Sequence, residues 1–212
     1  MSTHMITAHG AEYHLAGAYG SDNAISIDTI AHALAQINRF TGHAKRPYSV
    51  AEHSLLCADI AERLQLSPFV RLAALMHDAH EAYVGDVSSP AKQAIGQGWK
   101  DFEDIHTRAV RRHFGMLPVF TNARAQIHQC DLVALATERR DLMKWDEGVS
   151  SAWAILDTPG RVVPCAEWVD LNQAQREQRH WTEWRDLFLE RFHALRLANA
   201  EWFKANVREH LA

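Results

Sequence analysis

Through most of the chain, apolar residues recur at the three- and four-residue spacing of an amphipathic helix. This spacing predicts helices over residues 25–40, 49–64, 69–82, 99–114, 121–144 and 181–211, with a short helix beginning near residue 88. No segment has a clear strand pattern, and residues 145–170 are mixed, with prolines and a glycine that mark a loop. The pattern therefore predicts an all-α fold, a single-domain bundle of about six or more helices.

Several helix starts carry local signals. Ser49–Glu52 has the spacing of a capping box, and Ser67 before Pro68 pairs an N-cap with a proline in the first turn. Thr121 is expected to cap a long helix. Residues 69–82 are apolar on most sides of their predicted helix, so we expect that helix at the centre of the bundle.

The composition fits one globular domain with appendages. The 212 residues are 47% hydrophobic and 23% charged, which excludes a disordered chain and a coiled-coil rod. We expect residues 1–22 to form an extended or loosely packed N-terminal extension and residues 23–145 to form the core. Residues 146–212 are expected to be a C-terminal helical tail that packs on this core.

Charge and cysteine usage narrow the partners and the compartment. A net charge of −4 argues against binding a nucleic-acid polymer, although a local basic pocket for phosphate remains open. No stretch approaches the roughly 20 apolar residues of a membrane span, and the N-terminus lacks the layout of a signal peptide. The 3 cysteines include no CxxC pair, so we expect a cytoplasmic protein in a reducing compartment.

The candidate chemistry lies among 14 histidines. His77 and Asp78 follow an apolar run, where burying them is costly unless each is paired or bound to a metal. With His53 and Asp131 from two other helices they would form a mixed nitrogen and oxygen set that suits Zn, Mn, Co or Fe(II). A single helical histidine is more often a hydrogen-bonded structural residue, and the spacing alone leaves the two interpretations about equal.

Two more carboxylates follow on the same segment. Glu81 lies one helical turn after the His77–Asp78 pair, and Asp86 follows Gly85 in the turn that ends the helix. A carboxylate at this distance from a metal site is placed to act as general acid or base in hydrolysis. The alternatives are that Glu81 faces solvent and that Asp86 only caps the next turn.

The order His53, His77-Asp78, Asp131 resembles the signature of the HD-domain phosphohydrolase superfamily, which consists of all-helical metalloenzymes. The longer run MHDAHEAYVGDVSSPAK, residues 76–92, is similar to the HD-x-x-E-x-x-x-x-D-x-x-x-P-x-K segment of bacterial 5'-deoxynucleotidases and phage dATP triphosphohydrolases. The resemblance covers about residues 30–141. It implies a divalent cation (Co, Mn, Zn, Mg or Fe) on the four signature residues and hydrolytic roles for Glu81 and Asp86.

The resemblance also implies substrate contacts. Arg39 and Phe40 match an I-N-R-W stretch in which the arginine meets the nucleotide and the aromatic ring excludes a 2'-hydroxyl; here Phe replaces Trp. Lys92 would meet phosphate, and Pro90 would lie near the base. The plainer alternatives are that Arg39 balances a helix end, that Pro90 starts a helix and that Lys92 is exposed. Lys45 and Arg46 are expected in a solvated loop, and His4, His9 and His14 at the surface.

The leading functional hypothesis is a 5'-deoxynucleotidase that hydrolyses deoxynucleoside monophosphates. A triphosphohydrolase that releases tripolyphosphate is the alternative, because both share the same metal ligands. A non-catalytic nucleotide-binding domain and a cyclic-nucleotide or signalling-nucleotide phosphodiesterase are further alternatives. The aromatic residues of the tail predict a homodimer or larger homo-oligomer.

Overall fold

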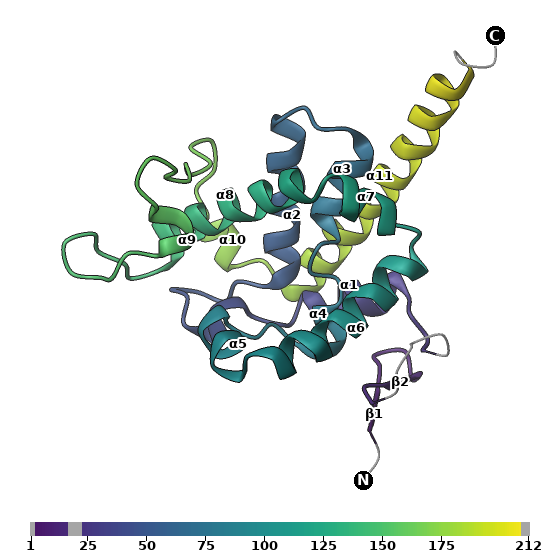
Figure 1. Cartoon of the computed structure of the whole chain (residues 1–212), viewed down its shortest axis with the longest axis horizontal. Coiled ribbons are helices and arrows are strands. Elements are labelled where there is room, and N and C mark those ends of the chain that lie inside the picture. The colour runs from purple at the N-terminus through teal and green to yellow at the C-terminus, as the bar shows by residue number, and fades with distance from the viewer. Residues whose placement is uncertain (1–2, 17–22, 209–212) are drawn as a thin grey trace.

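The computed structural model describes residues 3–16 and 23–208. The described chain is mostly helical, which confirms the all-α prediction, and a small hairpin precedes the helices (Figure 1). The elements, in chain order, are β1 (His4–Ile6), β2 (Glu12–His14), α1 (Ile27–Leu34), the 3₁₀ turn η1 (Arg39–Gly42), α2 (Val50–Arg63), α3 (Pro68–Leu75), α4 (Glu81–Val84), α5 (Ser89–Ile95), α6 (Gln97–His113), α7 (Leu117–Asn122), α8 (Arg124–Leu142), α9 (Ala154–Asp157), α10 (Ala174–Glu177) and α11 (Trp181–Arg208).

Helix α2 occupies the centre of the molecule and packs against α3, α8 and α11 (Figure 1). One apolar cluster joins α1, α3, α4 and the first half of α11. A second lies between α2, α8 and the segment that precedes α10. The two clusters fix the relative positions of α2, α3 and α8, the helices that border the candidate site.

The predicted caps form at both sites. Ser49 Oγ accepts from the Glu52 amide at 3.2 Å, and Ser67 Oγ accepts from the Val70 amide at 3.4 Å. The Glu52 carboxylate does not complete the capping box, because both of its oxygens accept from Arg46 at 2.8 Å. The expectation that Arg46 lies in a solvated loop is therefore wrong: its side chain is buried.

Two predicted helices are interrupted. The continuous helix expected over residues 69–82 ends at Leu75, and a short helix resumes at Glu81 after a turn. The long helix expected from Thr121 begins only at Arg124, and the Thr121 hydroxyl donates to the carbonyl oxygen of Leu117 within α7 instead of capping α8. The first interruption matters for function, because the turn carries His77 and Asp78.

The first predicted helix is also shorter than expected. It spans Ile27–Leu34, and the chain then enters η1, where Phe40 and Thr41 adopt left-handed backbone angles with φ of 57° and 54°. This conformation is rare for residues other than glycine and is held by surrounding structure. Arg39, at the start of η1, reaches Glu138 of α8.

The N-terminal hairpin was missed at the sequence level because its strands are only three residues long. Tyr13 is fully buried, stacks on Tyr83 at 3.9 Å between ring centroids, and its hydroxyl lies 2.9 Å from His106 Nδ1. The described part of the predicted 1–22 extension therefore docks on the core, while residues 1–2 and 17–22 lie outside the described residues. His9 is exposed, as expected, and its Nδ1 lies 3.0 Å from Thr29 Oγ1.

Helix α11 packs on α1, α2 and α3 and then extends beyond them (Figure 1). Its first half buries Trp184, Phe188 and Phe192, whereas Trp202 and Phe203 near its end are exposed. The predicted end of this helix, residues 209–211, lies outside the described residues. None of the described helices combines the length and apolar character needed to cross a membrane.

Candidate metal centre and active site

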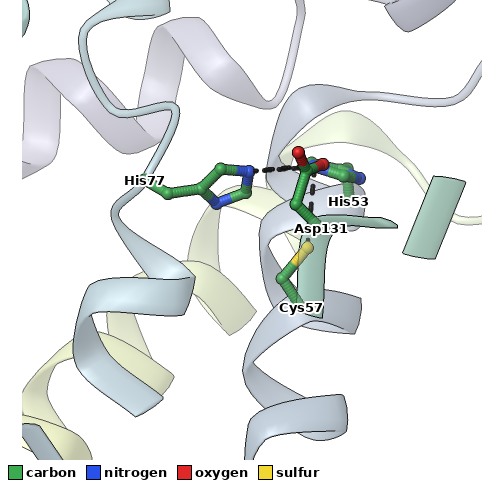
Figure 2. Close-up of side chains that lie close together, drawn as sticks. All are labelled: His53, Cys57, His77 and Asp131. Carbon is green, nitrogen blue, oxygen red and sulfur yellow. Dashed lines mark hydrogen bonds and ion pairs between the residues drawn. The ribbon is translucent and has the colours of Figure 1, made fainter. Parts of the chain in front are cut away.

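The four signature side chains meet at one point. His53 comes from the first turn of α2, His77 and Asp78 from the turn after α3, and Asp131 from α8. The two histidine Nε2 atoms lie 3.2 Å apart. His53 Nε2 is 3.4 Å from Asp131 Oδ1 and 3.5 Å from Asp78 Oδ2, while His77 Nε2 is 3.1 Å from Asp78 Oδ2. Figure 2 shows His53, His77 and Asp131 converging from separate elements.

Hydrogen bonds at the other ring nitrogens orient both imidazoles. His77 Nδ1 lies 2.8 Å from the carbonyl oxygen of Ala74, which can only accept, so Nδ1 carries the hydrogen. His53 Nδ1 donates in the same way to Glu138 Oε1 at 2.5 Å. In the neutral rings, both Nε2 lone pairs then face each other. A cation between them replaces this repulsion with coordination.

The spacing of the donor atoms fits a divalent transition metal. Nitrogen and oxygen ligands at about 2.1 Å from a metal are separated by about 3.0 Å at a right angle and about 3.4 Å at a tetrahedral angle. The separations that involve a histidine Nε2 atom run from 3.1 Å to 3.8 Å. The residues present therefore suit a divalent cation with mixed nitrogen and oxygen ligands.

The electrostatics of the cluster also favour a cation. Burial raises the pKa of Asp78 and Asp131, but their contacts with the two histidines outweigh burial and hold both pKa values below the ordinary range. Burial lowers the pKa of His77, and the two carboxylates overcome this and raise it well above its ordinary value. The negative field that would hold a proton on His77 also attracts a metal ion.

Arg39 belongs to the same cluster. Its Nη1 lies 3.6 Å from Asp78 Oδ2 and its Nη2 lies 3.2 Å from Glu138 Oε2, with only 11% of the side chain exposed. Its Nε is buried without a hydrogen-bond partner among the described residues. The alternative that Arg39 merely balances a helix end is wrong, because it pairs with side chains of the site. Phe40 beside it is half-buried, with its ring 6.5 Å from the ring of Trp153.

Glu81 is the most buried of the candidate acid–base groups. The alternative that Glu81 faces solvent is wrong, since this residue is only 3% exposed. Burial raises the pKa of its carboxyl well above the ordinary value, and the nearby charges of Asp78 and Asp86 add to this. Its Oε2 has no hydrogen-bond partner among the described residues, and its Oε1 lies 3.9 Å from Lys92 Nζ. The carboxyl is thus poised to hold a proton.

The remaining predicted residues surround Glu81. Asp86 is half-buried after the left-handed Gly85, and burial raises the pKa of its carboxyl too. Lys92 is half-buried and pairs with Glu103 Oε1 at 2.6 Å, so it is not an ordinary exposed lysine. Pro90 is exposed in the first turn of α5.

Comparison with known proteins places this site in a family. A model of the HD domain matches residues 50–139. The chain is 38% identical over 133 residues to the uncharacterized protein YfdR of Escherichia coli, covering 63% of this chain and 68% of that protein. It is also 38% identical over 128 residues to the uncharacterized protein RCAP_rcc00048 of Rhodobacter capsulatus, covering 58% of this chain and 65% of that protein. The chain belongs to the HD-domain family. Its class is therefore that of the metal-dependent phosphohydrolases.

Three further residues of this HD domain were missed at the sequence level. Glu138 follows Asp131 by seven residues, so helical spacing places both on one side of α8. Cys57 follows His53 by one turn, with its Sγ 3.6 Å from His53 Nε2. Both spacings were visible signals. Glu103 had no such signal in the sequence, because its partners His80 and Lys92 lie on other elements.

Proposed function

We propose that this HD-domain protein hydrolyses the 5'-phosphoester of deoxynucleotides, with deoxynucleoside monophosphates as the leading substrates. The observation that carries the proposal is the meeting of two imidazole Nε2 atoms 3.2 Å apart with two carboxylates. His53, His77, Asp78 and Asp131 would hold the divalent cation. A cation bound there supplies Lewis-acid activation of water and of a phosphate oxygen.

Arg39 and Lys92 provide the positive charge for phosphate. Arg39 lies against Asp78, with its Nη1 3.6 Å from Asp78 Oδ2. Lys92, which the resemblance assigns to phosphate, has its Nζ 3.9 Å from Glu81 Oε1. Both would neutralise charge that shifts onto the phosphate oxygens in the transition state.

Glu81 and Asp86 handle protons. A carboxyl whose pKa is raised by burial keeps its proton to a higher pH than an ordinary glutamate, which favours the role of general acid. Glu81 would therefore donate a proton to the leaving 5'-oxygen. Asp86, five residues after Glu81 and less buried, would accept the proton of the attacking water.

Phe40 and Pro90 would contact the nucleoside. The left-handed backbone at Phe40 fixes its ring next to Arg39, whose guanidinium carbon lies 5.5 Å from the ring centroid. A ring held beside the phosphate-binding arginine would crowd the sugar and favour a substrate without a 2'-hydroxyl. Pro90, exposed at the start of α5, would lie near the base.

Two other basic side chains of the same region, Arg46 and Lys45, support a monophosphate as the substrate. Arg46 is committed to Glu52 and to the carbonyl oxygen of Leu171, and Lys45 Nζ donates to the carbonyl oxygen of Asp141 at 2.8 Å. Neither extends the basic pocket, as binding a triphosphate would require. A triphosphohydrolase is therefore the second candidate. A phosphodiesterase and a non-catalytic nucleotide-binding domain follow, the latter disfavoured because all six ligand and acid–base positions are present.

A nucleotide panel tests this proposal. The protein is assayed with dAMP, AMP and dATP in the presence of Mn, Co, Mg or Zn, and inorganic phosphate is resolved from tripolyphosphate. We expect metal-dependent release of inorganic phosphate from dAMP and slower release from AMP. Tripolyphosphate from dATP would favour the second candidate, and no hydrolysis of any nucleotide with any metal would contradict the proposal.

A further inference from the structure

Cys57 lies against the metal centre. Its thiol is fully buried one helical turn after His53 on α2, and its Sγ lies 3.6 Å from His53 Nε2. The ligand atoms of His53, Cys57, His77 and Asp131 all lie within 4.8 Å of one another. In Figure 2 the sulfur points from α2 toward the Asp131 carboxylate and the two rings.

The position of the sulfur fits coordination. With a metal–sulfur distance of about 2.3 Å and a metal–nitrogen distance of about 2.1 Å, the two donors lie about 3.1 Å apart at a right angle and about 3.6 Å apart at a tetrahedral angle. A donor on the opposite side of the metal lies about 4.4 Å away. The 3.6 Å separation from His53 Nε2 matches the tetrahedral value.

We propose that Cys57 Sγ is a further ligand of the divalent cation, beside the four signature residues. This inference rests on the proposed metal centre and adds a soft donor to it. On binding, the thiol would release its proton to solvent, and the thiolate sulfur would donate a lone pair to the metal. Arg39, 3.6 Å from Asp78, offsets part of the added negative charge.

A sulfur ligand changes which metal the site prefers. Thiolate ligands favour Zn²⁺, Co²⁺ and Fe²⁺ over Mg²⁺ and Mn²⁺, which prefer oxygen. Cys130 is a built-in comparison: it is also fully buried and borders the same apolar cluster, but it is not part of the group of ligand atoms found among the described residues. If Cys57 were only a small apolar residue, the two thiols would behave alike.

Cobalt spectroscopy tests the assignment without relying on activity. Metal-stripped full-length protein is loaded with Co²⁺, whose visible bands report binding and whose near-ultraviolet sulfur-to-cobalt charge-transfer band reports a thiolate ligand. We expect this band in the wild type and in Cys130→Ser, and its loss in Cys57→Ser and Cys57→Ala. Chelator competition should show Zn²⁺ affinity falling at least about tenfold in Cys57→Ser, since even partners outside the ligand shell affect affinity by this much. Mn²⁺ affinity should fall less.

The outcomes separate the two proposals. Visible cobalt bands without a charge-transfer band in the wild type would overturn the sulfur ligand and leave the metal centre intact. Equal loss of the band in Cys57→Ser and Cys130→Ser would also overturn it, since the effect would then come from general damage to the core. No cobalt binding at all would contradict the metal centre and, with it, both proposals.

Discussion

Both oxygens of Glu138 are committed inside the protein. One accepts from His53 Nδ1 and the other from Arg39 Nη2, and the side chain is fully buried. One carboxylate thus fixes the tautomer of a proposed metal ligand and the position of the arginine proposed to bind phosphate. Because such outer partners orient the ligands, we class Glu138 as a positioning residue.

Glu138→Gln should weaken metal binding by about 10- to 100-fold. The amide oxygen of the new side chain can still accept from His53, but its NH₂ group then faces the Arg39 guanidinium, donor against donor. Chelator competition with Zn²⁺ and Mn²⁺ measures the effect, with Glu167→Gln as the control because that side chain is 84% exposed. Equal affinities in the two variants would contradict the positioning role.

Glu81 determines the expected pH dependence. A general acid works in its protonated form, which is present below its pKa and lost above it. Since burial raises the pKa of Glu81, kcat/KM should stay high to a higher pH than an ordinary glutamate would allow and fall as pH rises through this raised value. Glu81→Gln should lower kcat by about 10²–10⁴-fold and remove the alkaline fall from the residual activity.

The Glu81→Gln variant should fold, because a neutral amide replaces a buried carboxyl of the same shape. Thermal unfolding checks this, with no decrease in Tm expected. If the alkaline fall in kcat/KM persists in Glu81→Gln, another group carries the proton.

At the scale of elements, one charged cluster joins the C-terminal segment to the start of α2. Glu52 accepts from Arg46 and from Arg176 Nη1 at 2.8 Å, and Arg46 also donates to the carbonyl oxygen of Leu171. Glu52 and Arg46 are both buried. The first turn of α2, which carries His53, is therefore held by residues more than a hundred positions away in the sequence.

Glu52→Gln should lower the free energy of unfolding by about 3–5 kcal/mol, because it leaves the buried Arg46 charge without a counter-ion. Urea denaturation measures the change. Glu62→Gln is the matched control on the same helix: its side chain is 55% exposed, and the loss of its pairs with Arg71 and Arg191 should cost less than about 1 kcal/mol. Similar midpoints for the two variants would contradict the account of this cluster.

Some features of the helices could be predicted from the sequence, and others could not. Caps at Ser49 and Ser67 were predictable because a cap depends on residues three apart. The break between Leu75 and Glu81 was not, because no glycine or proline marks it and His77 Nδ1 closes the turn onto the Ala74 carbonyl. Contacts between distant segments leave no local trace in the pattern.

The same limit applies to the candidate site. The signature residues and Glu81 could be singled out by type and spacing, since burial makes an unpaired charge costly. The pairs of Arg39 with Asp78 and Glu138 could not be predicted, because they join residues far apart in the sequence.

At the scale of the whole molecule, parts outside the matched 50–139 region complete the site and its support. Arg39 precedes this region, the buried Tyr13 of the hairpin packs on α4 next to Glu81, and α11 backs α2 and α3. The chain thus acts as one folded unit, with the metal centre at the meeting point of α2, α3 and α8.

The homodimer or larger homo-oligomer stays a prediction. Only some of the aromatic residues on which this prediction rests are exposed. Trp184 and Phe188 are buried, while Trp202 and Phe203 near the end of α11 are 43% and 58% exposed. Sedimentation velocity on the full chain should give more than one subunit per particle. A monomer at micromolar concentration would contradict the prediction.

The central claim is that His53, His77, Asp78 and Asp131 hold the cation that hydrolysis requires. The most direct measurement determines bound metal and phosphate release from dAMP in the same preparations of wild type, Asp78→Ala and the control Asp186→Ala, whose side chain is 62% exposed in the wild type. We predict that Asp78→Ala loses bound metal and turnover together, while the control keeps both. Full turnover by Asp78→Ala without bound metal would contradict the claim.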